Sequence, residues 1–275
     1  MQANPATTPT ISYLSLQRSR RTLQDFVQSY FAYVGLQQQD LFKFLDILVF
    51  VEGSIYQMDE ENEALAKAGR EPAAGLLQGE QILQAVLEQQ GLLDQQVQDQ
   101  LLQGKEYWRL ERQLCKAMSV SEATDAHCCS FKQEDVLEAS SRKSFDYRVL
   151  HLLMLKLTGQ PVNDTLFAFL NLDERLVDMG DDLVDYEDDV LANSFNVLRG
   201  FVHLYGRHAH MHLVSVISGL EQQHARLLQQ LPAHIQHHHR QRHQQASVTP
   251  GSGDWVFPTA ILDEAKFRQQ HQEAN

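Results

Sequence analysis

Apolar residues recur at intervals of three and four positions through most of the 275-residue sequence, and runs of alternating apolar and polar residues are almost absent. The longer interval places apolar side chains on one face of an α-helix, whereas a half-buried strand needs an interval of two. Gly and Pro residues separate the periodic segments. The sequence therefore predicts an all-α, single-domain helical bundle, with helices over 20–35, 38–68, 76–90, 93–117, 132–158, 163–191, 193–230 and 259–270.

Both ends of the chain differ in composition from the segment 25–233, which carries the helical pattern. Residues 1–24 contain no Asp or Glu but several Ser, Thr and Arg, and we expect a flexible N-terminal segment. Residues 234–253 are rich in His and Gln and then in Ser, Pro and Gly, which is typical of a disordered, low-complexity insert. Aromatic residues follow, so we expect residues 254–275 to pack back on the bundle.

Histidines are concentrated in the insert, where His237, His238, His239 and His243 could bind a transition metal. No acidic residue accompanies them in the sequence, and a tract of this kind is usually a solvated surface segment. Upstream, the four residues ending at His224 read Glu-Gln-Gln-His, the spacing of a di-iron ligand motif. A di-iron bundle needs two such motifs, so we interpret this single one as a chance match.

Composition excludes several classes of protein. The net charge of −13 argues against general nucleic-acid binding, because no broad basic face is available for phosphates. No apolar run is long enough to span a membrane. The three cysteines form no zinc pattern and are interpreted as reduced thiols of an intracellular protein. Residues 1–24 also resemble an organellar transit peptide, so a cytoplasmic location and a plastid or other organelle both stay open, as do a monomer and a homodimer.

The most unusual local feature is an acidic run from Asp178 to Asp189, which holds seven carboxylates in twelve residues and keeps helical spacing. Like charges four positions apart repel, so a helix that carries several of them needs cations from elsewhere. A divalent metal ion is the obvious candidate, and a solvated helix face is the alternative. On a helix, four of the carboxylates would lie within about 60° of one another: Asp178, Asp182, Asp185 and Asp189.

A second acidic stripe lies upstream on the predicted helix 38–68. Glu52, Asp59 and Glu63 are separated by seven and then four positions, a spacing that recurs in the downstream run. Strongly apolar faces adjoin both stripes, as expected for helices that line a cavity with acidic ends at its mouth. Oxygen ligands without His or Cys select Mg²⁺ or Mn²⁺. An EF-hand is excluded, because Leu183 stands where its loop requires Gly.

The nine residues that begin at Asp181 resemble the second metal-binding motif of class I terpene synthases, Asn/Asp-Asp-Leu/Ile/Val-x-Ser/Thr-x-x-x-Glu. In that alignment Asp181, Asp185 and Asp189 are the metal ligands, with Asp in place of Ser/Thr at the middle position. The run is also similar to the Asp-Asp-x-x-Asp motif of isoprenyl diphosphate synthases. The chain further resembles plant and algal terpenoid-synthase-like proteins over most of residues 38–265.

The first aspartate-rich motif of that family has no regular counterpart here. The helix that carries Glu52 and Asp59 takes its place in order and approximate spacing, so the resemblance implies these two residues as further metal ligands. The family also keeps an upstream arginine that senses diphosphate, and Arg148 and Arg142 are the candidates for this catalytic role. The basic residue that usually precedes the last ligand is replaced by Asp188.

The resemblance implies a bundle of the isoprenoid synthase type with a central cavity. It also implies Mg²⁺- or Mn²⁺-dependent ionisation of a prenyl diphosphate, followed by cyclisation or elimination. Two alternatives stay open: a non-catalytic binding or regulatory protein of the same fold, and a chain-elongating prenyl diphosphate synthase, which would need a second basic pocket near the N-terminus. The implied substrate contacts come from three aromatic and two basic side chains: Tyr56, Phe50, Phe145, Arg199 and Lys266.

Overall fold

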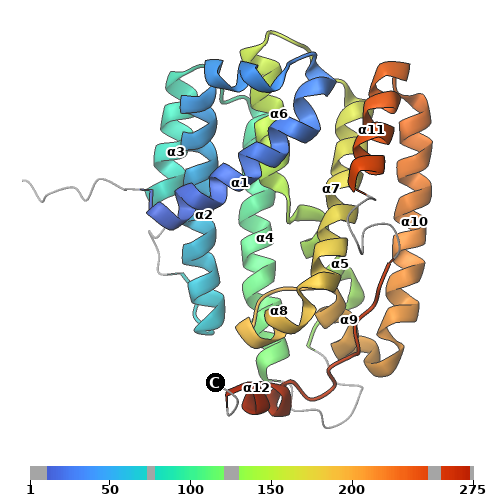
Figure 1. Cartoon of the computed structure of the whole chain (residues 1–275). Helices are drawn as coiled ribbons and strands as arrows, with labels where there is room; N and C mark the ends of the chain where they lie inside the picture. Colours follow the sequence, from blue (N-terminus) through green and yellow to red (C-terminus); the bar gives the residue numbers. More distant parts are fainter. Residues whose placement is uncertain (1–10, 73–77, 121–129, 247–254, 273–275) are drawn as a thin grey trace, which may run out of the picture.

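The computed structural model of the chain describes residues 11–72, 78–120, 130–246 and 255–272. Within these ranges the chain forms α-helices and short 3-10 helices, and no strand (Figure 1). The predicted all-α fold is therefore confirmed. No helix in the described part is both long enough and apolar enough to cross a membrane.

The α-helices are α1 (Tyr13–Tyr30), α2 (Leu45–Lys67), α3 (Gln78–Gln89), α4 (Gln95–Val120), α5 (Gln133–Arg142), α6 (Phe145–Leu157), α7 (Asp164–Val184), α8 (Tyr186–Ala192), α9 (Val197–Tyr205), α10 (Ala209–Gln230), α11 (Ala233–Ala246) and α12 (Glu264–Gln272). The 3-10 helices are η1 (Phe31–Val34), η2 (Gln38–Lys43) and η3 (Gly206–His208).

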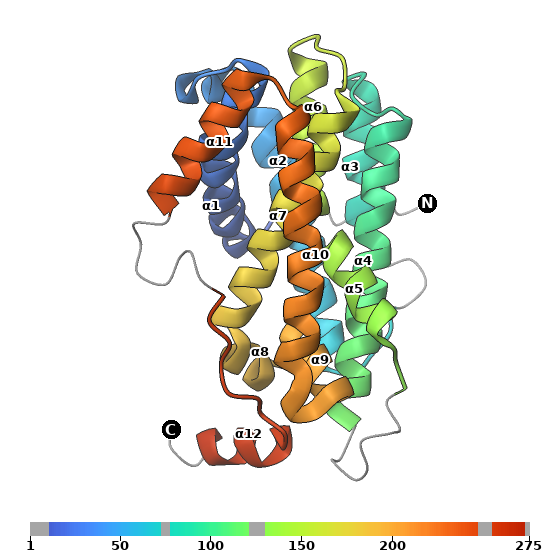
Figure 2. The same cartoon turned by 90° about the vertical axis from the view of Figure 1, so that its right-hand side faces the viewer.

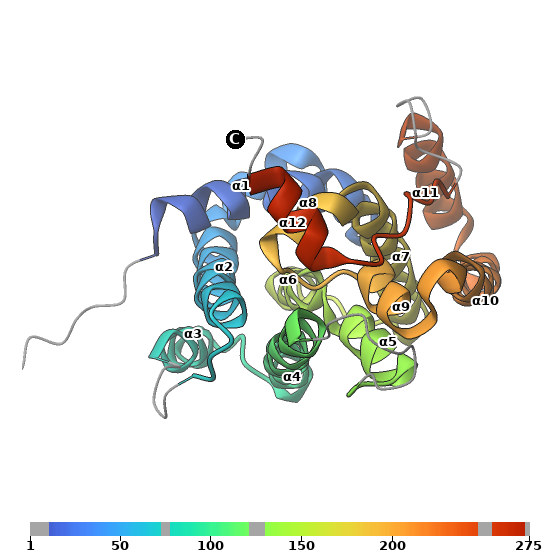
Figure 3. The same ribbon diagram turned by 90° about the horizontal axis from the view of Figure 1, so that it is seen from below.

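The long helices α2, α4, α6, α7 and α10 run up and down the bundle, and each packs along at least one of the others (Figures 1 and 2). α1 packs across α2, and α11 packs against η1. α8 and α9 lie together at the lower end in Figure 1. α12 packs against α8, and Figure 3 shows it crossing this end of the bundle.

Two groups of buried apolar side chains hold the helices together. The larger group runs through most of the length of the bundle and includes Leu87, Leu114 and Phe201. The smaller group lies where α1, η1, α6, α7 and α11 meet, and Phe26 and Phe169 are among its fully buried members. The second group thus joins helices from opposite ends of the sequence.

The predicted helix 132–158 is in fact two helices, α5 and α6, which meet at Lys143 and Ser144. Ser144 has non-helical backbone angles, φ −89° and ψ 40°. Phe145 then packs into space left by Gly104 of α4, where a Cβ atom would lie 2.4 Å from the phenylalanine ring. Because this contact fixes the start of α6 against α4, the polar residues at the break lie inside the bundle.

The acidic run bends where α7 gives way to α8. Asp185 stands between the two helices with φ −90° and ψ 6°. Its backbone N–H still donates to the carbonyl of Asp181, and the N–H of Asp189 donates to the carbonyl of Asp185, both at 2.8 Å. Since bonding at the helical interval continues across the bend, these three side chains keep a shared face.

The N-terminal segment differs from the flexible one expected over residues 1–24, because α1 begins within it. Ser12 caps this helix by accepting a hydrogen bond from the backbone N–H of Ser15 at 3.0 Å. Ser15 and Ser19 are buried as α1 packs on α2. A buried face built from serine is invisible to a search for apolar periodicity. Residues 1–10 lie outside the described residues.

The structure also corrects the disordered insert expected over residues 234–253, since α11 occupies most of it. Leu231 and Ile235 are buried in the smaller apolar group and attach this helix to the bundle. The rest of its sequence is dominated by His, Gln and Arg, so its composition hides the two apolar anchors. Residues 247–253 lie outside the described residues.

The C-terminal segment, predicted to return over residues 254–275, is described from Trp255 to residue 272. Trp255, Phe257 and Ile261 are partly buried against the larger apolar group. The segment therefore contacts the body of the protein in its described part.

Candidate functional site

The first acidic stripe starts at Glu52 of α2, whose side chain is fully buried. Neither of its carboxylate oxygens accepts a hydrogen bond from any donor. The carboxyl of Asp146, in the first turn of α6, lies near enough for its charge to act on Glu52. Burial, reinforced by the charge of Asp146, raises the pKa of Glu52 well above its usual range. Two neighbouring carboxyls cannot both ionise at low cost, so this pair needs a proton or a cation.

Asp59 lies two turns further along α2. Its Oδ1 accepts a hydrogen bond from Trp108 Nε1 at 2.9 Å, and the Arg18 guanidinium lies 3.8 Å from Oδ2. Burial, together with the charge of Glu63, raises the pKa of Asp59 to about 7. Arg18 is closer to Glu63, at 3.2 Å, so one half-exposed cation is shared between two carboxylates.

The buried members of the second stripe are bonded to the chain's own donors. Lys143 Nζ lies 2.6 Å from Asp182 Oδ1, and the other oxygen of Asp182 accepts from the backbone N–H of Val197 at 2.7 Å. Asp178 accepts from Ser144 Oγ at 2.6 Å. Burial alone would lower the pKa of Lys143, but Asp182 and Asp178 raise it above its ordinary value. The break between α5 and α6 thus supplies an internal cation to this stripe.

The three ligands implied by the resemblance lie nearer to solvent. Asp181 and Asp185 are exposed, and Asp189 is half-buried with Oδ2 accepting from Asn196 Nδ2 at 2.8 Å. Burial raises the pKa of Asp189 to about 6. Asp181, Asp185 and Asp189 share a face but are not gathered around one point. In the described part of the chain, the three ligand atoms that all lie within 4.8 Å of one another belong to a different group of residues, which includes His224.

The two stripes meet at Asp146. Its charge raises the pKa of Glu52 and Asp59 on α2, and also that of Glu174 and Asp178 on α7, in each case after the larger effect of burial. Burial raises the pKa of Glu174 to about 8 and that of Asp178 to about 7. We call this set the acidic interior: Glu52, Asp59, Asp146, Glu174, Asp178 and Asp182.

The predicted diphosphate sensor Arg148 is buried and fully bonded. Its guanidinium donates to Gln100 at 2.8 Å, to Glu174 at 3.1 Å and to the backbone carbonyl of Arg142 at 3.3 Å. Arg142, the second candidate, pairs with Glu138 on the partly exposed side of α5. Arg148 therefore neutralises one carboxylate of the acidic interior and is not a free anion receptor in this conformation. Arg142 differs, because its Nε is buried and has no hydrogen-bond partner.

The two other predicted basic contacts are far from equivalent. Arg199 is fully buried, and its Nε and Nη2 each donate to the Glu264 carboxylate at 2.8 Å. It also donates to Asn193 Oδ1 at 2.7 Å. Through its bonds to Glu264, Arg199 links α9 to α12. Lys266 is exposed, so its ammonium can reach solvent or a ligand.

The predicted aromatic contacts are Tyr56 and Phe50 on α2 and Phe145 at the start of α6. Tyr56 shares a hydrogen bond of 2.7 Å with Thr22 of α1. Phe145 is buried edge-on against Trp108 with ring centroids 5.4 Å apart, and Phe50 is partly buried against the larger apolar group. Their roles as substrate contacts stay predictions.

Sequence reasoning missed Asp146 and Glu174 as members of the site. Glu174 precedes Asp178 and Asp182 at intervals of four, so extending the acidic face one turn upstream would have found it. Asp146 gave no such signal, because its position depends on the break before α6. The Asn-Ser-Phe-Asn sequence after α8 also has a structural role: Asn196 caps α9 and donates to the backbone carbonyl of Asp182 at 2.6 Å.

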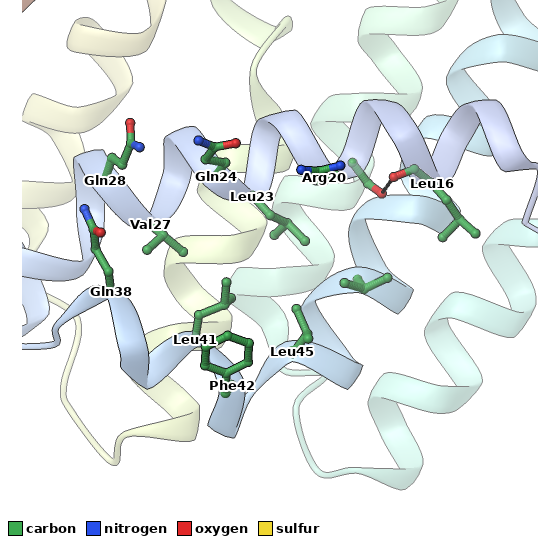
Figure 4. Close-up of a pocket in the computed structure, with 12 residues that line it drawn as sticks. Leu16, Arg20, Leu23, Gln24, Val27, Gln28, Gln38, Leu41, Phe42 and Leu45 are labelled. Carbon is green, nitrogen blue, oxygen red and sulfur yellow. Dashed lines mark hydrogen bonds between the residues drawn. The ribbon is translucent and has the colours of Figure 1, made fainter.

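A groove of about 480 Å³ lies on the outside of the bundle, between α1 and the η2–α2 segment (Figure 4). Leu16, Leu23 and Leu41 line it, and Arg20 is the charged side chain among its lining residues. None of the predicted site residues lines this groove. It is therefore distinct from the acidic interior.

Comparisons of the chain with protein-family models, with curated proteins and with solved structures found no match.

Proposed function

We propose that the chain is a Mg²⁺-dependent protein of the class I terpene synthase type, which breaks the carbon–oxygen bond of a prenyl diphosphate and releases diphosphate, with cyclisation or elimination of the resulting cation. The Glu52 carboxylate carries this proposal. It is fully buried, it accepts no hydrogen bond, and it faces a second carboxyl. Burying such a group costs several kcal/mol unless a positive partner is supplied.

The residues around Glu52 suit a hard divalent cation. Mg²⁺ commonly takes one or two protein carboxylates and completes its shell with water and substrate phosphate oxygens, so it does not require a ready three-carboxylate cluster. Glu52, Asp59 and Asp146 would hold ions on one side, and the exposed aspartates of the α7–α8 bend on the other. A bound divalent ion would neutralise charge on the leaving diphosphate.

A second candidate is a non-catalytic protein of the same fold that binds a diphosphate or a metal ion. The observation that favours it is the engagement of Arg148 and Arg199 in internal bonds, because diphosphate ionisation normally needs free cationic donors. No comparable observation supports chain elongation, since Arg20 alone contributes charge to the groove near α1.

Both candidates are tested by thermal melting of the purified chain with Mg²⁺ and inorganic diphosphate, together and separately. Ligand binding to the folded state raises the melting temperature, by about 2.7 kcal/mol of stabilisation at a hundredfold excess over Kd. Glu52→Gln should abolish the shift, because the amide is a poor ligand. The unliganded variant should remain folded, since it loses a buried repulsion between Glu52 and Asp146. Glu61→Gln, on the exposed side of α2, is the matched control and should keep the shift.

Turnover separates the two candidates. Geranyl, farnesyl and geranylgeranyl diphosphate are each incubated with the protein and Mg²⁺, and hydrocarbon product and released diphosphate are measured. Product formation that Glu52→Gln removes supports the enzyme. A Mg²⁺-dependent melting shift without turnover supports the binding protein, and absence of both the shift and turnover rejects the metal site itself.

A further inference from the structure

Three helices bring one carboxylate and two imidazoles together outside the acidic interior. Asp173 comes from α7, His224 from α10 and His239 from α11, which lie near one another at the upper end of the bundle in Figures 1 and 2. One ligand atom of each residue lies within 4.8 Å of the other two. The three residues are far apart in the sequence, whereas the histidines of the α11 tract are sequence neighbours.

The distances approach those of a metal site. His224 Nε2 is 2.9 Å from Asp173 Oδ1, and His239 Nδ1 is 3.9 Å from the same oxygen. Ligands at about 2.0–2.1 Å from a tetrahedral Zn²⁺ stand ~3.3 Å apart, between these two values. Small rotations of the side chains would therefore bring all three onto one ion.

The surroundings orient the three groups. The His224 and His239 rings both contact Phe169, with centroids 4.5 and 5.2 Å away. His239 Nδ1 is buried and has no hydrogen-bond partner. Arg242 donates to the other oxygen of Asp173 at 3.1 Å, leaving Oδ1 to the two imidazoles. A ligating carboxylate that is itself hydrogen-bonded is a common feature of metal sites.

We propose that Asp173, His224 and His239 bind one transition-metal ion of the Zn²⁺ class. Two imidazoles with one carboxylate form a ligand set of known zinc sites, which leave a fourth position for water or another ligand. An imidazole must be neutral to ligate. The proposal is independent of the Mg²⁺ site in the acidic interior.

The experiment must separate this site from loose binding by the histidine tract. The full chain, freed of metal with a chelator, is titrated with Zn²⁺ by calorimetry, and Co²⁺ is used as a visible-absorption probe of tetrahedral coordination. We expect one tight equivalent and the intense Co²⁺ bands of a four-coordinate site. His224→Gln and His239→Gln should each weaken this equivalent by about tenfold or more. His237→Gln, an exposed histidine on α11, is the matched control and should leave it unchanged.

His224 decides the outcome, because it lies on α10 and outside the histidine tract. If its replacement leaves Zn²⁺ affinity intact, or if His237→Gln weakens binding as much as His239→Gln, the tract alone binds metal and the proposal is overturned. Absence of a tight equivalent in the unchanged chain also overturns it. Circular dichroism confirms that each variant is folded, and His239→Gln gives a second test should His224→Gln disturb the packing of α10.

Discussion

Asp173 and Glu174 are neighbours in α7, are both buried, and belong to two different regions of the protein. Burial would raise the pKa of Asp173, but His224 and Arg242 hold it below its usual range. Burial raises the pKa of Glu174 to about 8 despite the pairing of its carboxylate with Arg148, and Asp146 and Asp178 add to the effect. The first carboxylate is surrounded by positive and neutral donors, whereas the second lies in an excess of acid.

The two regions show that a high number of carboxylates and a close approach of metal-ligand atoms are separate properties. The acidic interior has many carboxylates, which repel one another and lie on α2, α6 and α7 without forming a compact three-ligand group. The group around Asp173 has one carboxylate and two histidines, and their ligand atoms nearly meet. A dense run of acid in a sequence therefore indicates a need for cations, but tertiary packing determines where ligands converge.

Removing the buried cation of the acidic interior should give the largest effect on stability. Arg148→Met leaves Glu174 buried beside like charges, and breaking a buried pair in this way costs about 3–5 kcal/mol. Urea denaturation at pH 8 measures the loss, which should shrink at pH 5 as Glu174 takes up a proton. Arg142→Met breaks a partly exposed pair and should cost about 1 kcal/mol or less. Equal losses of unfolding free energy in the two variants would contradict the distinction between a buried and a partly exposed ion pair.

The pH dependence of stability should also differ between the regions. Burial raises the pKa of Asp178 to about 7 and that of Glu174 to about 8, so the folded state keeps protons that the unfolded chain releases. The free energy of unfolding should therefore fall as pH rises from about 4 to 8. Glu264 acts oppositely, because His203 and Arg199 outweigh burial and lower its pKa to about 2. The stability that this carboxylate contributes is therefore lost as the pH falls below the ordinary pKa of a glutamate.

Urea titrations that extend below this range should consequently show a maximum near about pH 4. Mg²⁺ at pH 8 should restore part of the loss if the acidic interior binds divalent cations. Asp173 should contribute nothing to the loss at high pH, because its pKa is lowered. A flat profile above pH 5 would show that the buried carboxylates are not protonated as described.

The smallest effect is expected at Lys266. Its side chain is exposed, so Lys266→Ala should change the free energy of unfolding by no more than about 0.5 kcal/mol. Because the fold is unperturbed, any weakening of Mg²⁺-dependent diphosphate binding in this variant would be due to the lost charge. Calorimetric titration with diphosphate measures it, and unchanged binding would remove Lys266 from the site.

The fold class could be predicted because apolar periodicity records which helix faces are buried. The starts of α1 and α11 could not, since buried serines occupy the start of one, and few buried apolar residues, Leu231 and Ile235, mark the start of the other. Both acidic stripes could be found from local spacing. The position of Asp146 depends on a helix break determined by Phe145 and Gly104, which no spacing rule contains.

The group around Asp173 was missed for a related reason. His239 lies in a tract whose composition indicates solvent exposure, and the motif ending at His224 matched only half of a pattern. Their meeting requires α7, α10 and α11 to pack together, and this packing depends on apolar contacts between segments that are far apart in the sequence.

The tie between Arg199 and Glu264 has a consequence for how the chain folds during synthesis. Arg199 is fully buried and receives its counter-ion from a residue far downstream. Until residue 264 leaves the ribosome, α9 cannot take its final place without burying the Arg199 guanidinium in the absence of its counter-ion. The lower end of the bundle should therefore be the last part to consolidate on a nascent chain, even though α9 itself is made much earlier.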